Sequence, residues 1–130
     1  MDPVTHFEMP ADDMKRAQEF YSDAFGWTHS APPGMEGEYE MTMTSETADD
    51  MRPKERGRID GAFYNREEPD VGTLITVEVD SIDNALARIE DAGGEVAMPK
   101  NAVGEWGFYA RFRDSEGNLV GLWESAMEQG

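Results

Sequence analysis

A histidine and a glutamate two residues apart, His6 and Glu8, have the types and spacing best suited to chemistry in this chain. Segment 4–9 alternates in the way typical of a strand, which puts both side chains on one face and Phe7 on the other. An imidazole beside a carboxylate can serve as a metal ligand or as a general base. A structural interpretation, in which His6 is a half-buried, hydrogen-bonded histidine, explains the same pattern.

A second copy of this pattern occurs at segment 74–79, where Glu78 takes the place of Glu8. If both copies face one cavity, His6, Glu8 and Glu78 converge there. Two or three acids around one imidazole could form a metal site. They could also raise the pKa of one carboxyl group enough for it to abstract a proton. These three residues are the predicted catalytic group.

Each of the two strands leads into an amphipathic helix with its own start and stop signals. Asp12 or Asp13 can cap the first helix, which is predicted over 13–25 and ends at Gly26. Ser81 caps the second, which ends at the glycine pair 93–94. Three further strands follow each helix, so the predicted strands are 4–9, 27–30, 39–44, 58–64, 74–79, 95–98, 107–113 and 118–124.

This order predicts an α+β fold, a single domain over 1–130 built from two βαβββ modules. Module 1 covers about 4–65, a linker about 66–72 and module 2 about 73–126. The modules are expected to form curved mixed sheets around a cleft, with the helices on the outer faces. Loop 45–57 has no counterpart of equal length in module 2, so it is a candidate lid or dimer contact, or a tolerated insertion.

The composition narrows the choice of partners. The chain has 28 acidic and 11 basic residues, a formal net charge of −17, and no cysteine. Nucleic acid and anionic membrane surfaces are poor partners for such a charge, and no apolar run is long enough to span a bilayer. Because the acids are dispersed and lysine is scarce, we expect a cytoplasmic protein from a halophile; an acidic mesophilic protein and one with a basic partner are the alternatives.

Several motifs follow one another over nearly the whole chain: 4–8, the helix with Phe20-Tyr21 that ends in 25–27, the helix start 82–86, its end 92–94, and 112–118. In this order they resemble the vicinal oxygen chelate superfamily, the group of glyoxalase I, bleomycin-resistance proteins and extradiol dioxygenases. The resemblance implies a two-module fold, a small-molecule ligand held in a cleft, and pairing into a homodimer.

In metal-dependent members of that superfamily, the first and last strands of each module supply four ligands to a divalent ion. The resemblance puts His6, Thr76, Gly61 and Gly121 at these positions, and of the four only His6 binds metal well. Shifting the first module by one residue would put Asp60 in place of Gly61, but this breaks the period-two parity with Gly121. The expected cofactor is therefore none, or one divalent metal ion.

The predicted function is that of a glyoxalase/bleomycin-resistance-like protein that binds a small molecule with most of the family metal site lost. The alternatives are a divalent-metal-dependent lyase, epimerase or dioxygenase with a site rebuilt around His6, and a regulatory protein that uses the fold as a scaffold. Gly61 and Gly121 are expected to open space for the ligand, between aromatic walls. The predicted ligand-contacting residues are Gly61, Phe63, Thr76, Arg111, Gly121 and Trp123.

Each of these assignments has a structural alternative. Aromatic residues on inner sheet faces, such as Phe63 and Trp123, are commonly core. Arg111 could bind a ligand carboxylate or pair with one of the many acids of the chain. His29, at a strand edge, is expected at the surface.

Overall fold

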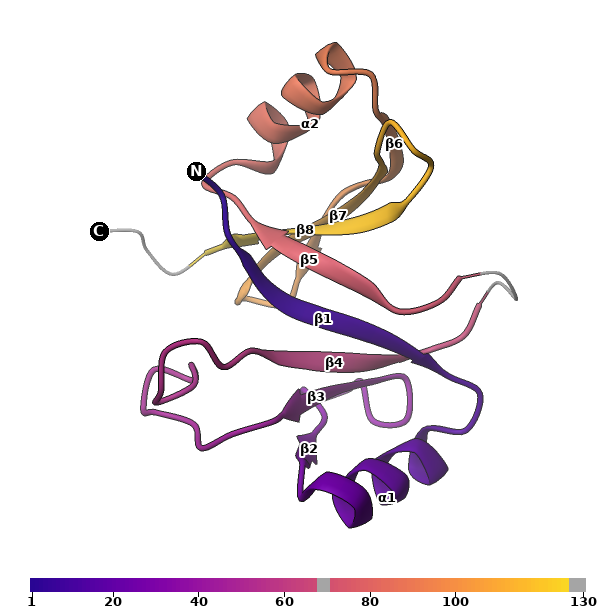
Figure 1. Ribbon diagram of the computed structural model, residues 1–130, viewed down its shortest axis with the longest axis vertical. Helices are drawn as coiled ribbons and strands as arrows, with labels where there is room; N and C mark the ends of the chain where they lie inside the picture. The colour runs from indigo at the N-terminus through magenta and orange to yellow at the C-terminus, as the bar shows by residue number, and fades with distance from the viewer. Residues whose placement is uncertain (68–70, 127–130) are drawn as a thin grey trace. The chain divides into compact units, whose positions relative to one another are not determined.

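The computed structural model of the chain describes residues 1–67 and 71–126. Its elements are, in order, β1 (Val4–Ala11), α1 (Met14–Phe25), β2 (Thr28–Ser30), β3 (Tyr39–Met43), β4 (Asp60–Asn65), β5 (Leu74–Glu78), α2 (Ile82–Asp91), β6 (Glu95–Val103), β7 (Gly107–Arg113) and β8 (Leu119–Ser125) (Figure 1). The chain therefore has the predicted α+β fold.

The chain divides into two compact units, and each is described by itself. The N-terminal unit is His6–Thr73, and the C-terminal unit combines Met1–Thr5 with the chain from Leu74 onward. Two contacts explain why the first residues belong to the C-terminal unit. The Glu78 amide donates to the Pro3 carbonyl oxygen (2.9 Å), and Arg88 pairs with Asp2 (3.4 Å).

Each unit has a mixed sheet of four strands and one helix. In the N-terminal unit the order is β2-β3-β4-β1, with β1 and β4 parallel and the other neighbours antiparallel. In the C-terminal unit it is β5-β8-β7-β6, with β5 and β8 parallel. A parallel pair needs a crossover, and the helix and the two intervening strands provide it in each unit. The predicted βαβββ modules are therefore confirmed.

The helix ends use the predicted caps. The Asp13 side chain accepts the Arg16 amide (3.0 Å) at the start of α1, and Gly26 ends this helix with a left-handed backbone (φ 75°). The Ser81 hydroxyl accepts the Asn84 amide (3.1 Å) at the start of α2. These contacts satisfy amide groups that would otherwise lack an intrahelical partner.

Each helix covers one face of its own sheet. Five buried residues form the core of the C-terminal unit: Val79, Ile82, Ala85, Ala110 and Leu122. Three form that of the N-terminal unit: Ala11, Met14 and Phe63. Because core residues fill the side beneath the helix, a ligand site in each unit is expected on the opposite face of the sheet.

Some predicted boundaries were wrong. β6 runs five residues past the predicted end at 98, because two register shifts, between Val96 and Met98 and between Met98 and Asn101, keep it paired to β7. β4 begins at Asp60, two residues later than expected. The polar loop 45–57 carries a small antiparallel bridge between Thr47 and Pro53. Of the predicted linker at 66–72, residues 68–70 lie outside the described part of the chain.

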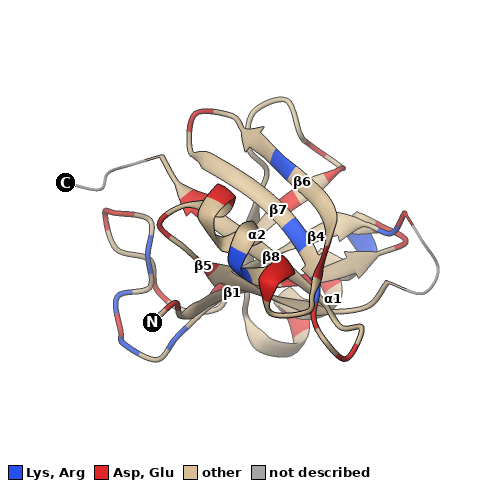
Figure 2. Cartoon of the chain, turned by 90° about the horizontal axis from the view of Figure 1, so that it is seen from above, with Lys and Arg blue, Asp and Glu red and all other residues tan. Residues whose placement is uncertain are grey.

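Acidic residues, red in Figure 2, are spread over helices, strands and loops of both units. In residues 1–67 and 71–126, neither helix has the length and apolar character to cross a membrane.

Candidate functional site

The helix-free face of the N-terminal unit carries the residues that first pointed to chemistry. β1 and β4 run parallel with His6 opposite Asp60 and Glu8 opposite Ala62, and side chains paired in this way lie on the same face. Glu8 is 4% exposed and Asp60 is 9% exposed. Adjacent strands lie about 4.8 Å apart, so an imidazole and two carboxyl groups share one small area.

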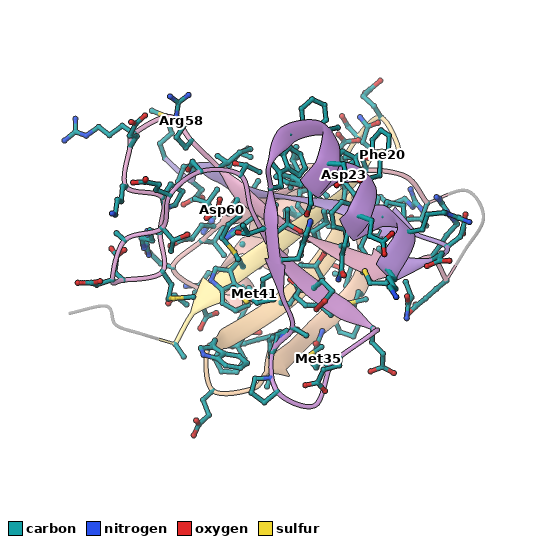
Figure 3. The ribbon with its side chains drawn as sticks, turned by 90° about the horizontal axis from the view of Figure 1, so that it is seen from below. Phe20, Asp23, Met35, Met41, Arg58 and Asp60 are labelled. Carbon is teal, nitrogen blue, oxygen red and sulfur yellow. The ribbon has the colours of Figure 1, made fainter. Side chains whose placement is uncertain are left out.

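Asp60 is held in place by the neighbouring strand. Its Oδ1 atom accepts the Thr44 amide (2.9 Å), and the Thr44 hydroxyl donates to the Ile59 carbonyl oxygen (2.6 Å). These two bonds fix the start of β4, where the strand leaves the loop. Figure 3 labels Asp60, the first residue of β4, with Met41 of β3 and Phe20 of α1.

The structure corrects the register on which the predicted ligand positions depended. His6 pairs with Asp60 in the N-terminal unit, just as Thr76 pairs with Gly121 in the C-terminal unit. The counterpart of Gly121 is therefore Asp60, and the one-residue shift that sequence parity disfavoured is the correct alignment.

Gly61 and Phe63 were predicted to face a ligand, and both lie on the other face. Phe63 packs with Ala11 and Met14 beneath α1 and is 1% exposed, so it is a core residue. Gly61 does not open a cavity either. A Cβ built there would lie 2.5 Å from the carbonyl oxygen of Phe7 and 2.6 Å from its ring, so glycine is needed because Phe7 fills the space.

The helix-free face of the C-terminal unit holds the other predicted residues. Thr76 pairs with Gly121 and Glu78 with Trp123 across β5 and β8. On β7, Tyr109 lies opposite Trp123 and Arg111 opposite Gly121. The structure therefore brings Thr76, Glu78, Gly121, Trp123 and Arg111 together on one face, with Tyr109 as a further member.

Arg111 and Tyr109 form a defined pair on this face. The Arg111 Nε–H donates to the Tyr109 hydroxyl oxygen (2.7 Å), and the guanidinium carbon lies 5.4 Å from the centre of the tyrosine ring. Both side chains are half-buried. Because Nε is bound to Tyr109, the plane of the guanidinium group is fixed, and its Nη donors have a set direction.

The donors of the two units differ in their capacity to hold a metal ion. At the paired positions the N-terminal unit has an imidazole and a carboxylate, His6 and Asp60, whereas the C-terminal unit has Thr76 and Gly121. Within residues 1–67 and 71–126, no group of three or more histidine, aspartate and glutamate side chains is arranged to hold a metal ion. Thr76 and Gly121 therefore do not supply the imidazole or carboxylate groups that two of the four positions of such a site require. The convergence of Glu78 with His6 and Glu8, which belong to the other unit, stays a prediction.

His29 was expected at the surface, and that prediction was wrong. It is half-buried on the α1 side of the N-terminal unit, with Nδ1 3.0 Å from the Thr42 hydroxyl oxygen. Burial lowers the pKa of His29 below its ordinary value of 6.5, an effect that the charge of Glu40 partly opposes. The signal in the sequence was the polar pair Glu40 and Thr42 on one face of β3.

Comparison with known proteins agrees with this fold. The family model of the Glyoxalase/Bleomycin resistance protein/Dioxygenase superfamily matches residues 4–122, and the chain belongs to this superfamily. The "Putative glyoxylase CFP32" of Mycobacterium tuberculosis is 30% identical over 121 residues, 91% of this chain. The chain spans 44% of the length of that relative.

Two further proteins are similar over most of their own length. The "Glyoxylase-like domain-containing protein" of Didymella fabae is 29% identical over 117 residues, 88% of each chain. The structure of a methylmalonyl-CoA epimerase variant from Streptomyces coelicolor superposes with a TM-score of 0.69 over 98% of this chain and 97% of the epimerase, at 17% identity. At this identity the epimerase supports the fold alone.

Proposed function

We propose that the chain binds a small organic molecule on the helix-free face of its C-terminal unit, without a metal ion of the family type. The observation that carries the proposal is the pairing of Thr76 with Gly121, where the other unit pairs His6 with Asp60. Two positions without a strong metal donor lie beside Arg111 and Trp123. Such a face suits an organic ligand better than a cation.

The same face suggests the chemistry of the ligand. Trp123 offers a flat apolar surface for a planar ring. Arg111, oriented by Tyr109, offers Nη donors for a carboxylate. Glycine at position 121 puts no side chain between Thr76 and Arg111, its neighbours in register. The ligand class we propose is a small planar carboxylate.

A matched pair of probes tests this proposal. 2-Naphthoate should bind in isothermal titration calorimetry, and the neutral 2-naphthamide should bind at least tenfold more weakly. Trp123→Leu and Arg111→Gln should each weaken 2-naphthoate binding by about tenfold or more, since one removes the ring surface and the other the fixed charge. Trp106→Leu, which alters a 47% exposed tryptophan, is the control and should bind normally. Equal binding of the two probes, or normal binding by both site variants, would contradict the proposal.

A second candidate function is a divalent-metal-dependent lyase, epimerase or dioxygenase centred on His6. The observation in its favour is that Asp60 is beside His6 and Glu8 is on the same face, although the described side chains are not arranged to hold a metal ion as they stand. A divalent ion bound there would act as a Lewis acid toward substrate oxygens.

Elemental analysis of protein purified in molar salt, without chelators or an affinity tag, separates the two candidates. His6→Ala should abolish metal content if the second candidate is correct. His29→Asn is the control, because His29 is the second of two histidines in the chain and lies on the opposite face. Near-stoichiometric metal that disappears in His6→Ala favours the metal enzyme, whereas wild-type protein without metal favours the organic ligand.

The proposal includes a homodimer working in a salt-rich cytoplasm. The net charge of −17 supports the high-salt setting, since concentrated salt screens repulsion between acids. Light scattering on protein eluting from a sizing column in molar potassium chloride should give twice the monomer mass of 14.5 kDa. A monomer at all concentrations would remove the homodimer from the proposal.

A further inference from the structure

A group of polar side chains lies beneath α1, on the face of the N-terminal sheet opposite His6 and Glu8. Its members come from three elements: Gln18 on α1, His29 on β2, and Glu40 and Thr42 on β3. Glu40 pairs with Phe63 and Thr42 pairs with Gly61 across β3 and β4, which puts them on the core side. We call these four residues the polar cluster.

Two hydrogen bonds join the polar cluster in pairs. Gln18 Nε2 donates to Glu40 Oε1 and links α1 to the sheet. His29 Nδ1 lies 3.0 Å from the hydroxyl oxygen of Thr42, a residue that is fully buried. His29 pairs with Thr42 in register, so Glu40, two residues earlier on β3, is its diagonal neighbour. Diagonal neighbours are about 7–8 Å apart, within reach of long side chains.

One atom of each pair is buried with no hydrogen-bond partner of ordinary distance and angle among the residues that the structure describes: His29 Nε2 and Glu40 Oε2. The backbone of Gln18 lies near enough to the imidazole to raise the pKa of His29, but its geometry is not that of an ordinary hydrogen bond to Nε2. Buried polar atoms in native proteins nearly always have a partner, either protein or ordered water. A carboxylate oxygen only accepts, and a neutral imidazole has one donor and one acceptor nitrogen. A molecule between the two atoms therefore has to donate to Glu40 and accept from His29, or donate to both.

We propose that the polar cluster is a binding site for one internal water molecule, which accepts from His29 Nε2–H and donates to Glu40 Oε2. Two hydrogen bonds of ordinary length through one water span about 5.5 Å, which suits side chains on diagonal neighbours. The Thr42 hydroxyl then donates to Nδ1. The cluster becomes a continuous chain from Gln18 on the helix to Thr42 in the sheet, in which Gln18 joins α1 to Glu40 and the water joins Glu40 on β3 to His29 on β2.

The surroundings favour water over an ion. The rings of Phe63 and Tyr21 flank the cluster, with the His29 and Phe63 rings 5.7 Å apart and the Tyr21 and Phe63 rings 5.3 Å apart. The titratable groups on this side are His29, Glu40 and Tyr21, while the charged residues of α1, namely Lys15, Arg16, Glu19 and Asp23, are exposed. One carboxylate and one imidazole are too few ligands for a transition-metal ion.

Nuclear magnetic resonance can test the site directly, because the chain has two histidines and His6→Gln assigns their signals. At pH 7.5 in molar salt, the nitrogen shifts of His29 should show a proton on Nε2 and none on Nδ1. That proton should exchange slowly and show cross-relaxation to a water molecule with a long residence time. His6, on the opposite face, is the internal comparison.

Glu40→Gln gives a second readout. Removing the carboxylate takes away the charge that raises the pKa of His29, so the midpoint of the His29 titration should fall to lower pH. A proton on Nδ1, an Nε2 proton with no water contact, or a His29 midpoint that Glu40→Gln leaves unchanged would overturn the proposal. Should Glu40→Gln fail to fold, the wild-type measurements decide alone.

Discussion

The two units share a strand order and a single covering helix, yet they carry different chemistry at equivalent positions. The parallel strand pair puts an imidazole beside a carboxylate in the N-terminal unit, His6 with Asp60. It puts a hydroxyl beside a glycine in the C-terminal unit, Thr76 with Gly121. The topology thus determines which positions face away from the helix, while the residues at those positions vary independently.

The sides of the two sheets that face the helices also differ. The C-terminal unit packs Ile82 and Ala85 of α2 against aliphatic residues such as Leu122. The N-terminal unit packs α1 on Phe63 together with the polar cluster. A helix can therefore be attached to the same kind of sheet by an apolar core alone, or by a smaller apolar core with buried hydrogen bonds.

The largest effect should come from removing the salt that screens the acidic residues of both units. Transfer from molar salt to dilute buffer lengthens the Debye length from about 3 Å to about 30 Å, so repulsion among the acids acts across both units. We expect the circular dichroism signals of helix and strand to fall together. An unchanged spectrum on dilution would refute the halophile prediction.

Core substitutions test whether the face of the N-terminal sheet beneath α1 stabilises the fold. Phe63→Ala should lower the free energy of unfolding by about 3–5 kcal/mol, since it empties a fully buried position beneath α1. Phe20→Ala on the same unit is the control, because that ring is 60% exposed, and its effect should stay within about 0.5 kcal/mol. Urea titrations in molar salt measure both. Similarly small losses of unfolding free energy in the two variants would contradict a core role for Phe63 and would again favour its prediction as a ligand contact.

Removal of the N-terminal cap of the helix should lower stability by a similar amount in the two units. Asp13→Ala and Ser81→Ala each remove the side chain that accepts an amide in the first turn, so each should cost about 1 kcal/mol. The same urea titrations suffice, with Glu19→Ala on the exposed side of α1 as the reference. A large difference between the two cap variants would show that the helices contribute unequally to the fold.

The smallest expected effect is a pH dependence of the free energy of unfolding that arises from His29 in the N-terminal unit. The pKa of His29 is lowered in the folded chain, so between the folded pKa and 6.5 the unfolded chain binds more protons. The stability that His29 contributes is therefore complete above 6.5 and is lost as the pH falls through the folded pKa. The urea midpoint should decline modestly between pH 7.5 and 5, and less so in His29→Asn. An identical decline in both would show that other groups cause it.

The helices and the family were predictable because their signals are local. Asp13, Gly26 and Ser81 act within a single turn, and the order of motifs along the chain follows the family. The faces of β4 were not predictable in the same way. Asp60 to Phe63 are all buried, so this strand lacks the polar alternation that reveals parity, and its register depends on pairing with β1.

The predictions of the length of β6 and of the exposure of His29 were wrong for related reasons. Pro99 reads as a strand end, but β6 is the last strand in the order of its sheet and is irregular, and at a sheet edge proline is tolerated. His29 lies in a three-residue strand, too short for any periodic signal. Thr76 and Gly121 were placed by the resemblance to the family, and Trp123 and Arg111 by alternation along their strands, whereas the position of Asp60 required the observed register.

The first five residues pair with the second half of the chain, through Pro3 with Glu78 and Asp2 with Arg88. The C-terminal unit is therefore encoded by two segments of the chain, which lie on either side of the continuous N-terminal unit. A chain cut between Thr73 and Leu74 would give a second fragment without these partners, and its two pieces should recover their structure best when mixed. The same interleaving makes the protein a candidate for a split reporter whose halves signal only after they meet.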